Sequence, residues 1–139
     1  MLWRAIYILR EAKRILPILL SLLLLACNQQ AERVQEQVVL QDDLGREIML
    51  QKQPSRVFSF ASSMTEMLYA VLDTSTIIAR TPNDDYPAAA LEKPVVNNYP
   101  VDYEQVLALK PDLIFTVEGI TPLEVAERLQ ELGVPVYYQ

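Results

Sequence analysis

The sequence predicts an α/β domain, in which a parallel β-sheet built from alternating strands and helices follows a β-hairpin. Two observations support this prediction. From residue 54 onward, short β-rich apolar runs alternate with stretches in which apolar residues recur at helical spacing. Before them, two apolar runs flank a short acidic turn that contains a glycine. Strands that alternate with helices form a parallel sheet covered on both faces, so we expect ligands beyond the carboxyl ends of its strands.

The hairpin is expected over residues 38–53, "VVLQDDLGREIMLQKQ". Gly45 lies in its turn and can supply the positive φ that a tight turn needs. Four strands are expected after the hairpin, at residues 56–60, 76–80, 112–116 and 134–138. Ligands are therefore expected near the three loops that follow strand ends, at residues 61–63, 81–85 and 117–121.

The first helix is expected from "SSMTEMLYAVL", where Ser63 and Glu66 have the spacing of a capping box. Met64 and Met67 recur at helical spacing and are expected in the core. Ser63 also lies beside the free N–H groups of the helix start, where it could face a ligand.

Two further helices carry clear start and stop residues. In the first, Asp102 is the expected N-cap and Pro111 ends the helix. In "TPLEVAERLQELG", Thr121 is the expected cap, Pro122 the first helical residue and Gly133 the stop.

The connection over residues 81–101 is long for a compact domain, and such connections are often functional. We expect a short helix near residues 86–91. Asp84 and Asp85 either cap that helix or contact a ligand or metal. Tyr86 and Tyr99 either pack half-buried or grip an amphipathic ligand. The amides, acids and tyrosines of this connection are Asn83, Asp84, Asp85, Tyr86, Asn97, Asn98 and Tyr99.

Residues 1–26 are interpreted as a signal peptide, because a basic start is followed by the uncharged run "ILPILLSLLLLA". This run ends at Cys27, and "LLAC" resembles the lipobox of bacterial lipoproteins. Cys27 would then be lipidated and anchor the protein to a membrane; the alternative is a buried cysteine in an apolar segment. Residues 27–37 would form the tether, and residues 38–139 the domain.

Composition limits the possible functions. Residues 28–139 carry 8 Lys and Arg against 17 Asp and Glu, a net charge of −9, which argues against a nucleic-acid partner. The sequence has no histidine, and its one cysteine lies at the expected anchor. A disulfide, a thiolate metal site and a cysteine nucleophile are therefore excluded from the mature domain. We expect no enzyme activity and no cofactor.

Several segments together resemble one family, the ABC-transporter substrate-binding proteins for cobalamin, haem and iron–siderophores. The strongest is "DYEQVLALKPDLIF", which is similar to the family pattern Leu-Glu-x-Ile-x-Ala-Leu-Lys-Pro-Asp-Leu-Val. "DDLGREIML" with "PSRVFSF", "SSMTEML" and the "DDYP" of residues 84–87 also resemble family segments. The resemblance runs from about residue 38 to the end of the sequence.

This resemblance implies one Rossmann-like, N-terminal lobe of a two-lobe binding protein, and we expect the second lobe to be absent from this sequence. It implies a metal-chelate ligand, an ABC permease as partner, and a lipid-anchored position in the cell envelope facing the periplasm or the cell exterior. By position in the family pattern, Asn83 and Asn98 face the ligand and Glu104 pairs with the permease. The residues alone favour the alternative, in which Glu104 is a helix-starting acid that favours the helix dipole.

Six residues are thus predicted to bind ligand: Ser63, Asn83, Asp84, Tyr86, Asn98 and Tyr99. Two other functions stay open. One is an α/β enzyme with chelatase-like or hydrolytic activity, which two carboxylates could support as acid and base. The other is an inactive, truncated lobe with an exposed sheet edge.

Overall fold

The structure, a computed structural model, describes residues 37–139. A hairpin of β1 (Val38–Gln41) and β2 (Glu47–Leu50) opens the domain. The strands are antiparallel, with Val39 opposite Met49. Gly45 lies in the turn at φ 77°, so the predicted hairpin and its glycine are confirmed.

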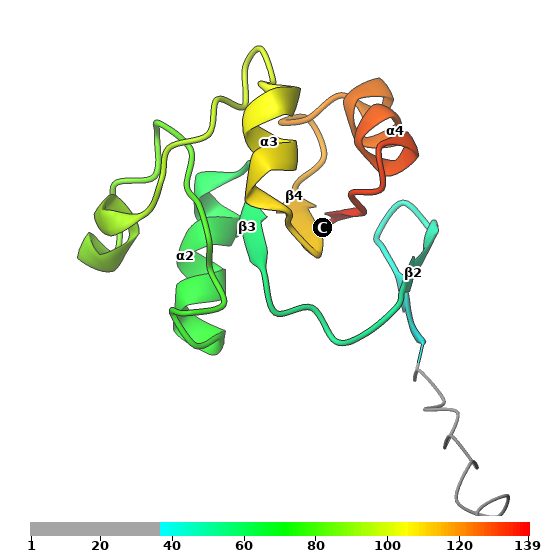
Figure 1. The fold of residues 1–139 in the computed structure, drawn as a ribbon, viewed down its shortest axis with the longest axis horizontal. Coiled ribbons are helices and arrows are strands. Elements are labelled where there is room, and N and C mark those ends of the chain that lie inside the picture. Colours follow the sequence, from blue (N-terminus) through cyan, green and yellow to red (C-terminus); the bar gives the residue numbers. More distant parts are fainter. Residues whose placement is uncertain (1–36) are drawn as a thin grey trace, which may run out of the picture. The chain divides into compact units, whose positions relative to one another are not determined.

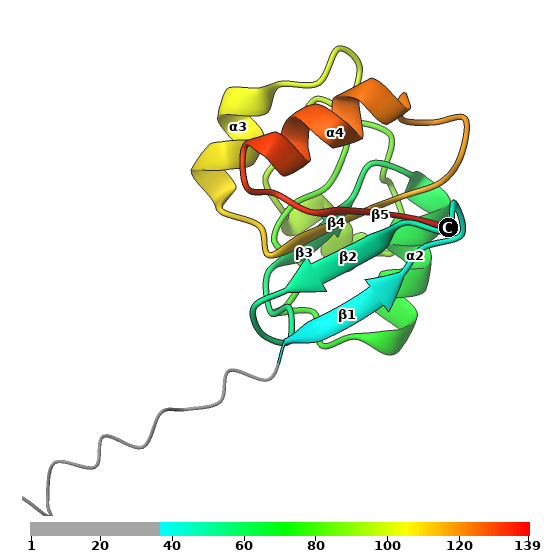
Figure 2. The same cartoon turned by 90° about the vertical axis from the view of Figure 1, so that its right-hand side faces the viewer.

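The predicted parallel sheet is confirmed with three regular strands in the order β3 (Val57–Ser59), β4 (Leu113–Thr116) and β5 (Val136–Tyr138). Figure 1 shows β3 beside β4, and Figure 2 shows all three strands with α4 above them and the hairpin below them. Residues 76–80 do not form the predicted strand. Ile77 makes a single parallel bridge to Val57, and Arg80 pairs instead with Val95. The chain thus leaves the sheet after one contact.

Both faces of the sheet are covered, as predicted, because side chains alternate along each strand. One face contributes Phe58, Ile114 and Val136 to a core shared with α3 (Tyr103–Leu109) and α4 (Leu123–Glu131). The other face contributes Val57 and Leu113 to a core shared with α2 (Ser62–Val71) and the hairpin.

The predicted capping box of α2 is wrong. The helix starts at Ser62 with Ala61 as N-cap, and no side chain caps it. Ser63 and Glu66 are exposed within the helix. The turn from β3 is held instead by Ser59, whose hydroxyl accepts a 2.9 Å hydrogen bond from the Ala61 amide.

Met67 was expected in the core but is 48% exposed. The face of α2 that carries Met64 and Leu68 packs on the sheet. A neighbouring face contacts the 81–101 connection, because the Tyr69 hydroxyl donates to the Ala89 carbonyl at 3.3 Å. Met67 lies on neither face and therefore points outward.

The start and the end of α3 follow the sequence closely. Asp102 caps the helix, and its carboxylate accepts from the Gln105 amide at 3.0 Å. The helix ends before Pro111, with Lys110 in the left-handed region at φ 50°. Arg56 donates to the Leu109 carbonyl at 2.7 Å and so satisfies a free group at the helix end.

For α4 the predicted stop is confirmed and the predicted cap is wrong. Gly133 has φ 86° and follows the last turn. Thr121, however, is buried, and its hydroxyl shares a 2.8 Å hydrogen bond with that of Thr116. The N-cap position belongs to Pro122.

The 81–101 connection contains the expected short helix, a 3₁₀ segment at Ala88–Glu92. Within residues 37–139, no helix combines the length and the apolar character needed to cross a bilayer. The proposed signal peptide, Cys27 and the tether up to residue 36 lie outside the described residues.

Candidate functional site

The loops that follow β3 and β4 meet at the carboxyl edge of the sheet, because parallel strands end at the same edge. A further segment reaches this edge from the 81–101 connection: the Asn98 side-chain amide donates to the Phe60 carbonyl at 2.8 Å. This contact places Asn98 and the adjacent Tyr99 at the end of β3.

An open groove of about 580 Å³ lies at this edge. Its walls come from the hairpin turn, from the segment before α3, and from the loop between β4 and α4. The lining residues are Leu44, Tyr99, Glu118, Gly119, Ile120, Thr121, Pro122, Leu123 and Tyr138. Tyr99 is 86% exposed and Ile120 is 50% exposed, so the groove presents an aromatic ring and an aliphatic side chain to solvent.

Residues 117–122, the groove loop, are held by short-range contacts. The Ile120 amide donates to the Val117 carbonyl at 3.2 Å, and Gly119 permits the turn with φ 85°. Below them, the paired hydroxyls of Thr116 and Thr121 join the loop to the end of β4. These contacts hold the groove loop in a conformation that exposes Ile120.

Asp84 is buried and has a structural role in the loop after Arg80. Its carboxylate accepts hydrogen bonds from the Thr81 amide at 2.7 Å and the Thr81 hydroxyl at 2.9 Å. It also accepts from the Thr65 hydroxyl on α2 at 3.0 Å. Both oxygens are thus occupied within the protein, so Asp84 does not cap the following 3₁₀ segment. The expected ligand contact from Asp84 would require this loop to open.

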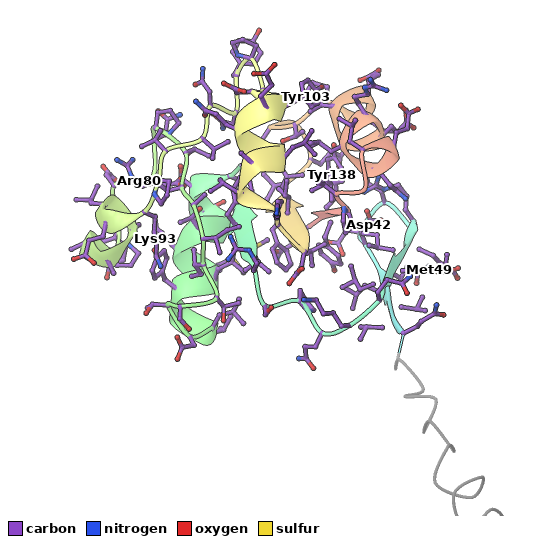
Figure 3. The ribbon with its side chains drawn as sticks, viewed as in Figure 1. Asp42, Met49, Arg80, Lys93, Tyr103 and Tyr138 are labelled. Atoms are coloured by element: carbon purple, nitrogen blue, oxygen red, sulfur yellow. The ribbon has the colours of Figure 1, made fainter. Side chains whose placement is uncertain are left out.

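The Arg80 side chain also contacts this loop. Its Nη1 donates to the Thr81 carbonyl at 3.0 Å and approaches the Asp84 carbonyl at 3.4 Å. Figure 3 shows Arg80 and Tyr138 on opposite sides of α3, so this loop and the groove are separate regions.

The six predicted ligand residues therefore divide into groups. Asn98 and Tyr99 lie at the groove end of the sheet. Asn83 and Tyr86 are exposed on the loop near Arg80, and Ser63 is exposed at the start of α2. No hydrogen bond in the described part of the chain joins Asn83, Tyr86 or Ser63 to the groove.

The sequence did not point to Leu44, Glu118 or Ile120 individually. The loop after β4 was expected at the ligand edge, which was the available signal for Glu118 and Ile120. For Leu44 there was none, because its place depends on the hairpin turn folding back against β5. The Asp43 amide donates to the Tyr138 carbonyl at 3.0 Å and makes this contact.

Glu104 is exposed in the first turn of α3, where its charge favours the helix dipole. Within residues 37–139 it makes no salt bridge. Its carboxylate is thus free to meet a cation on another protein, and both interpretations of Glu104 remain compatible with its position.

Within residues 37–139, no three His, Cys, Asp or Glu side chains lie close enough together to hold a metal ion. The site is an apolar groove with one acid, Glu118, on its wall. Such a surface is suited to binding a ligand with a large apolar face.

A family model described as periplasmic binding protein matches residues 57–139. The vitamin B12-binding protein of Vibrio parahaemolyticus is 38% identical over 84 residues, which are 60% of this chain and 30% of that protein. The corresponding protein of Vibrio vulnificus is 37% identical over 93 residues, or 66% of this chain and 34% of that protein. The chain spans about a third of the length of these curated relatives.

Solved structures have the same fold. The periplasmic vitamin B12 binding protein of Vibrio cholerae superposes with a TM-score of 0.56 at 34% identity, over 61% of this chain and 34% of that one. The heme binding protein HmuT superposes with a TM-score of 0.63 over 74% of this chain and 34% of that one. Its identity is 22%, so this second likeness concerns the fold alone.

Proposed function

Because the chain belongs to the periplasmic binding protein family, we propose that it forms the N-terminal, ligand-binding lobe of a receptor that serves an ABC importer. The family is one of binding proteins, which removes the α/β enzyme from consideration. The observation that carries the proposal is the groove at the carboxyl edge of the sheet, with Tyr99 and Ile120 exposed on its walls. Ligands of open α/β sheets bind at this edge.

The proposed ligand class is cobalamin, haem or a ferric siderophore. The names of two relatives as vitamin B12-binding proteins support this class. So does the chemistry of the groove, since a corrin or a porphyrin offers a large apolar face. In this proposal Asn98 and Tyr99 contact the ligand directly. Asn83, Tyr86 and Ser63 contact it only if the ligand extends beyond the groove.

The proposal also includes a lipid anchor at Cys27 and a position in the cell envelope, facing the periplasm or the cell exterior. The sequence "LLAC" supports the anchor. The net charge of −9 over residues 28–139 would keep the domain off an anionic bilayer while the tether holds it nearby. A second lobe, closing over the groove, would complete the receptor.

Replacing Tyr99 by alanine tests the groove. We expect Tyr99→Ala to weaken binding of hemin or cyanocobalamin by about tenfold, because an exposed ring in contact with a flat ligand contributes up to about 1.5 kcal/mol. Equilibrium dialysis with the purified full chain measures the change.

Val71→Ala is the matched control, because Val71 is 76% exposed on α2 and does not line the groove. If the two variants bind the ligand with equal affinity, Tyr99 does not contact the ligand. Tyr86→Ala, measured in parallel, reports whether the ligand reaches the loop near Arg80.

Replacing Glu104 by glutamine tests permease docking. In a receptor that carries this lobe together with its second lobe, Glu104→Gln is expected to weaken binding to the permease about threefold to tenfold and to leave ligand affinity unchanged. The effect should decrease at high salt, since exposed ion pairs are screened.

The control for this experiment is Glu127→Gln, an exposed acid in α4. Binding of each variant to the permease in nanodiscs gives the comparison. Identical binding by the two variants would leave Glu104 with its helix-starting role alone.

A further inference from the structure

The N-terminal hairpin precedes the part of the chain that the family model matches, which begins at residue 57. Nevertheless its turn reaches the ligand edge. Leu44 is 40% exposed and lines the groove opposite the groove loop. The hairpin therefore covers one face of the sheet and also lines the groove.

The turn is closed by an ion pair between Asp42 and Arg46. The Arg46 amide donates to one carboxylate oxygen of Asp42 at 2.8 Å, and its guanidinium donates to the other at 2.8 and 2.7 Å. Asp42 is 4% exposed. Burial alone would raise the pKa of this carboxyl, but the hydrogen bonds and charge of Arg46 outweigh it and hold the pKa below its usual 3.8. The pair is therefore ionised at neutral pH.

The same guanidinium ties the turn to β5. Its Nη2 donates to the Val136 carbonyl at 2.8 Å, and its carbon lies 4.8 Å from the centre of the Tyr138 ring. A guanidinium over an aromatic face is attracted by the ring electrons. Asp42 thus orients Arg46, and Arg46 covers Tyr138.

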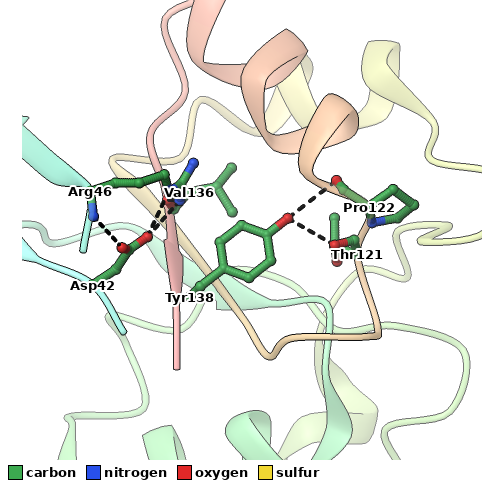
Figure 4. Close-up of polar contacts among 6 residues, drawn as sticks. All are labelled: Asp42, Arg46, Thr121, Pro122, Val136 and Tyr138. Carbon is green, nitrogen blue, oxygen red and sulfur yellow. Dashed lines mark hydrogen bonds and ion pairs between the residues drawn. The ribbon is translucent and has the colours of Figure 1, made fainter. Parts of the chain in front are cut away.

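Tyr138 carries the connection to the groove loop. Its hydroxyl donates to the Thr121 carbonyl at 2.8 Å and lies 3.2 Å from the Pro122 carbonyl. Burial raises the pKa of Tyr138 above its usual 10.0, so the hydroxyl keeps its proton and can donate. Figure 4 shows this chain of contacts from Asp42 through Arg46 and Tyr138 to the groove loop. We call Asp42, Arg46 and Tyr138 the hairpin clasp.

We propose that the hairpin forms part of the ligand-binding surface of the groove. Leu44 contacts the ligand, and the hairpin clasp holds the groove loop in position. The inference rests on the proposed function for the ligand contact. Leu44, Ile120 and Leu123 make this part of the groove aliphatic, so it would take an apolar edge of the ligand. The clasp residues are positioning residues, since their charged and hydroxyl groups are occupied within the protein.

Hydrogen exchange of the purified full chain tests the clasp without any ligand. Tyr138→Phe removes both hydroxyl contacts and keeps the ring. The amides of Ile120, Val125 and Ala126 are expected to exchange about fivefold faster, because their hydrogen bonds depend on the groove loop and on Pro122. Amides of α2 should not change, because α2 packs on the other face of the sheet.

Tyr137→Phe is the control, because Tyr137 is the neighbouring residue on the opposite face of β5. If Tyr138→Phe does not fold, Arg46→Lys replaces it: the charge remains, but the two-pronged contact with Asp42 and the stacking on Tyr138 are lost. Faster exchange confined to residues 118–126 supports the proposal. Exchange equal to that of Tyr137→Phe overturns it.

Leu44 is tested by binding of hemin and cyanocobalamin. Leu44→Ser is expected to lower the affinity for the probe that binds about threefold to tenfold. Val39→Ser is the control, since Val39 is 57% exposed on the same hairpin and does not line the groove. Equal affinities of the two variants overturn the ligand contact. If the wild-type chain binds neither probe, the proposed function and the ligand contact both fail, while the exchange experiment still decides the clasp.

Discussion

Replacing Asp84 by alanine is expected to lower the free energy of unfolding by about 3 kcal/mol, because it leaves buried donors without an acceptor. The Thr81 amide and hydroxyl and the Thr65 hydroxyl all donate to this carboxylate. Asp84 is 1% exposed, so water does not replace the lost contacts while the loop keeps its conformation. Urea unfolding of the full chain measures the loss.

Asp85→Ala is the matched control, because Asp85 is the next residue and is exposed. It should change the unfolding free energy by less than about 0.5 kcal/mol. Equal stabilities of the two variants would mean that the carboxylate of Asp84 is not needed to hold the loop. The ligand interpretation of Asp84 would then regain support.

Replacing Leu129 by alanine is expected to cost about 3 kcal/mol, since truncating a fully buried leucine removes apolar contact and leaves a cavity. Leu129 is 0% exposed and packs against Val136 and its neighbours in the core beneath α4. Because α4 begins directly after the groove loop, loss of this packing should also loosen the groove. The midpoint of urea unfolding gives the first effect, and exchange of the Ile120 amide gives the second.

Leu132→Ala provides the control on the same helix end. Leu132 is the C-cap of α4 and is 38% exposed. Its truncation should cost less than about 1 kcal/mol. A loss at Leu132 as large as that at Leu129 would mean that α4 is rotated relative to the sheet.

Much of the fold could be predicted because the responsible contacts are local. Gly45 and Gly133 adopt the positive φ that their places in a turn and after a helix required. Asp102 caps α3 through a residue three positions away. The two covered faces of the sheet were predicted from the alternation of strands with helices along the chain.

The errors arose where distant segments decide the structure. Thr121 could cap α4, but the hydroxyl of Thr116 and the packing beneath the groove loop take it inward. Residues 76–80 have the composition of a strand, yet Arg80 pairs with Val95 from the long connection. Nothing within either segment indicates these partners.

In the candidate site, too, local features were predicted and contacts between distant segments were not. Tyr99 was expected to face a ligand, and it lines the groove; whether it binds one stays a prediction. Leu44 could not have been found, because the hairpin turn must first be placed against β5 by Arg46. Asp84 was expected to cap the following helix or to contact a ligand or metal. Nothing in the sequence indicates that its carboxylate accepts from Thr65, because Thr65 lies on α2, 19 residues away along the chain.

The most direct test of the ligand-binding lobe is hydrogen exchange of the full chain with and without hemin, cyanocobalamin and a ferric siderophore. The groove is open to solvent, so each probe is used at high concentration. We predict that at least one probe slows exchange in residues 43–46, 98–103 and 118–123, which surround the groove. Protection by none of the probes, or only around the hollow at the opposite edge near Lys52 and Asp112, would contradict the account.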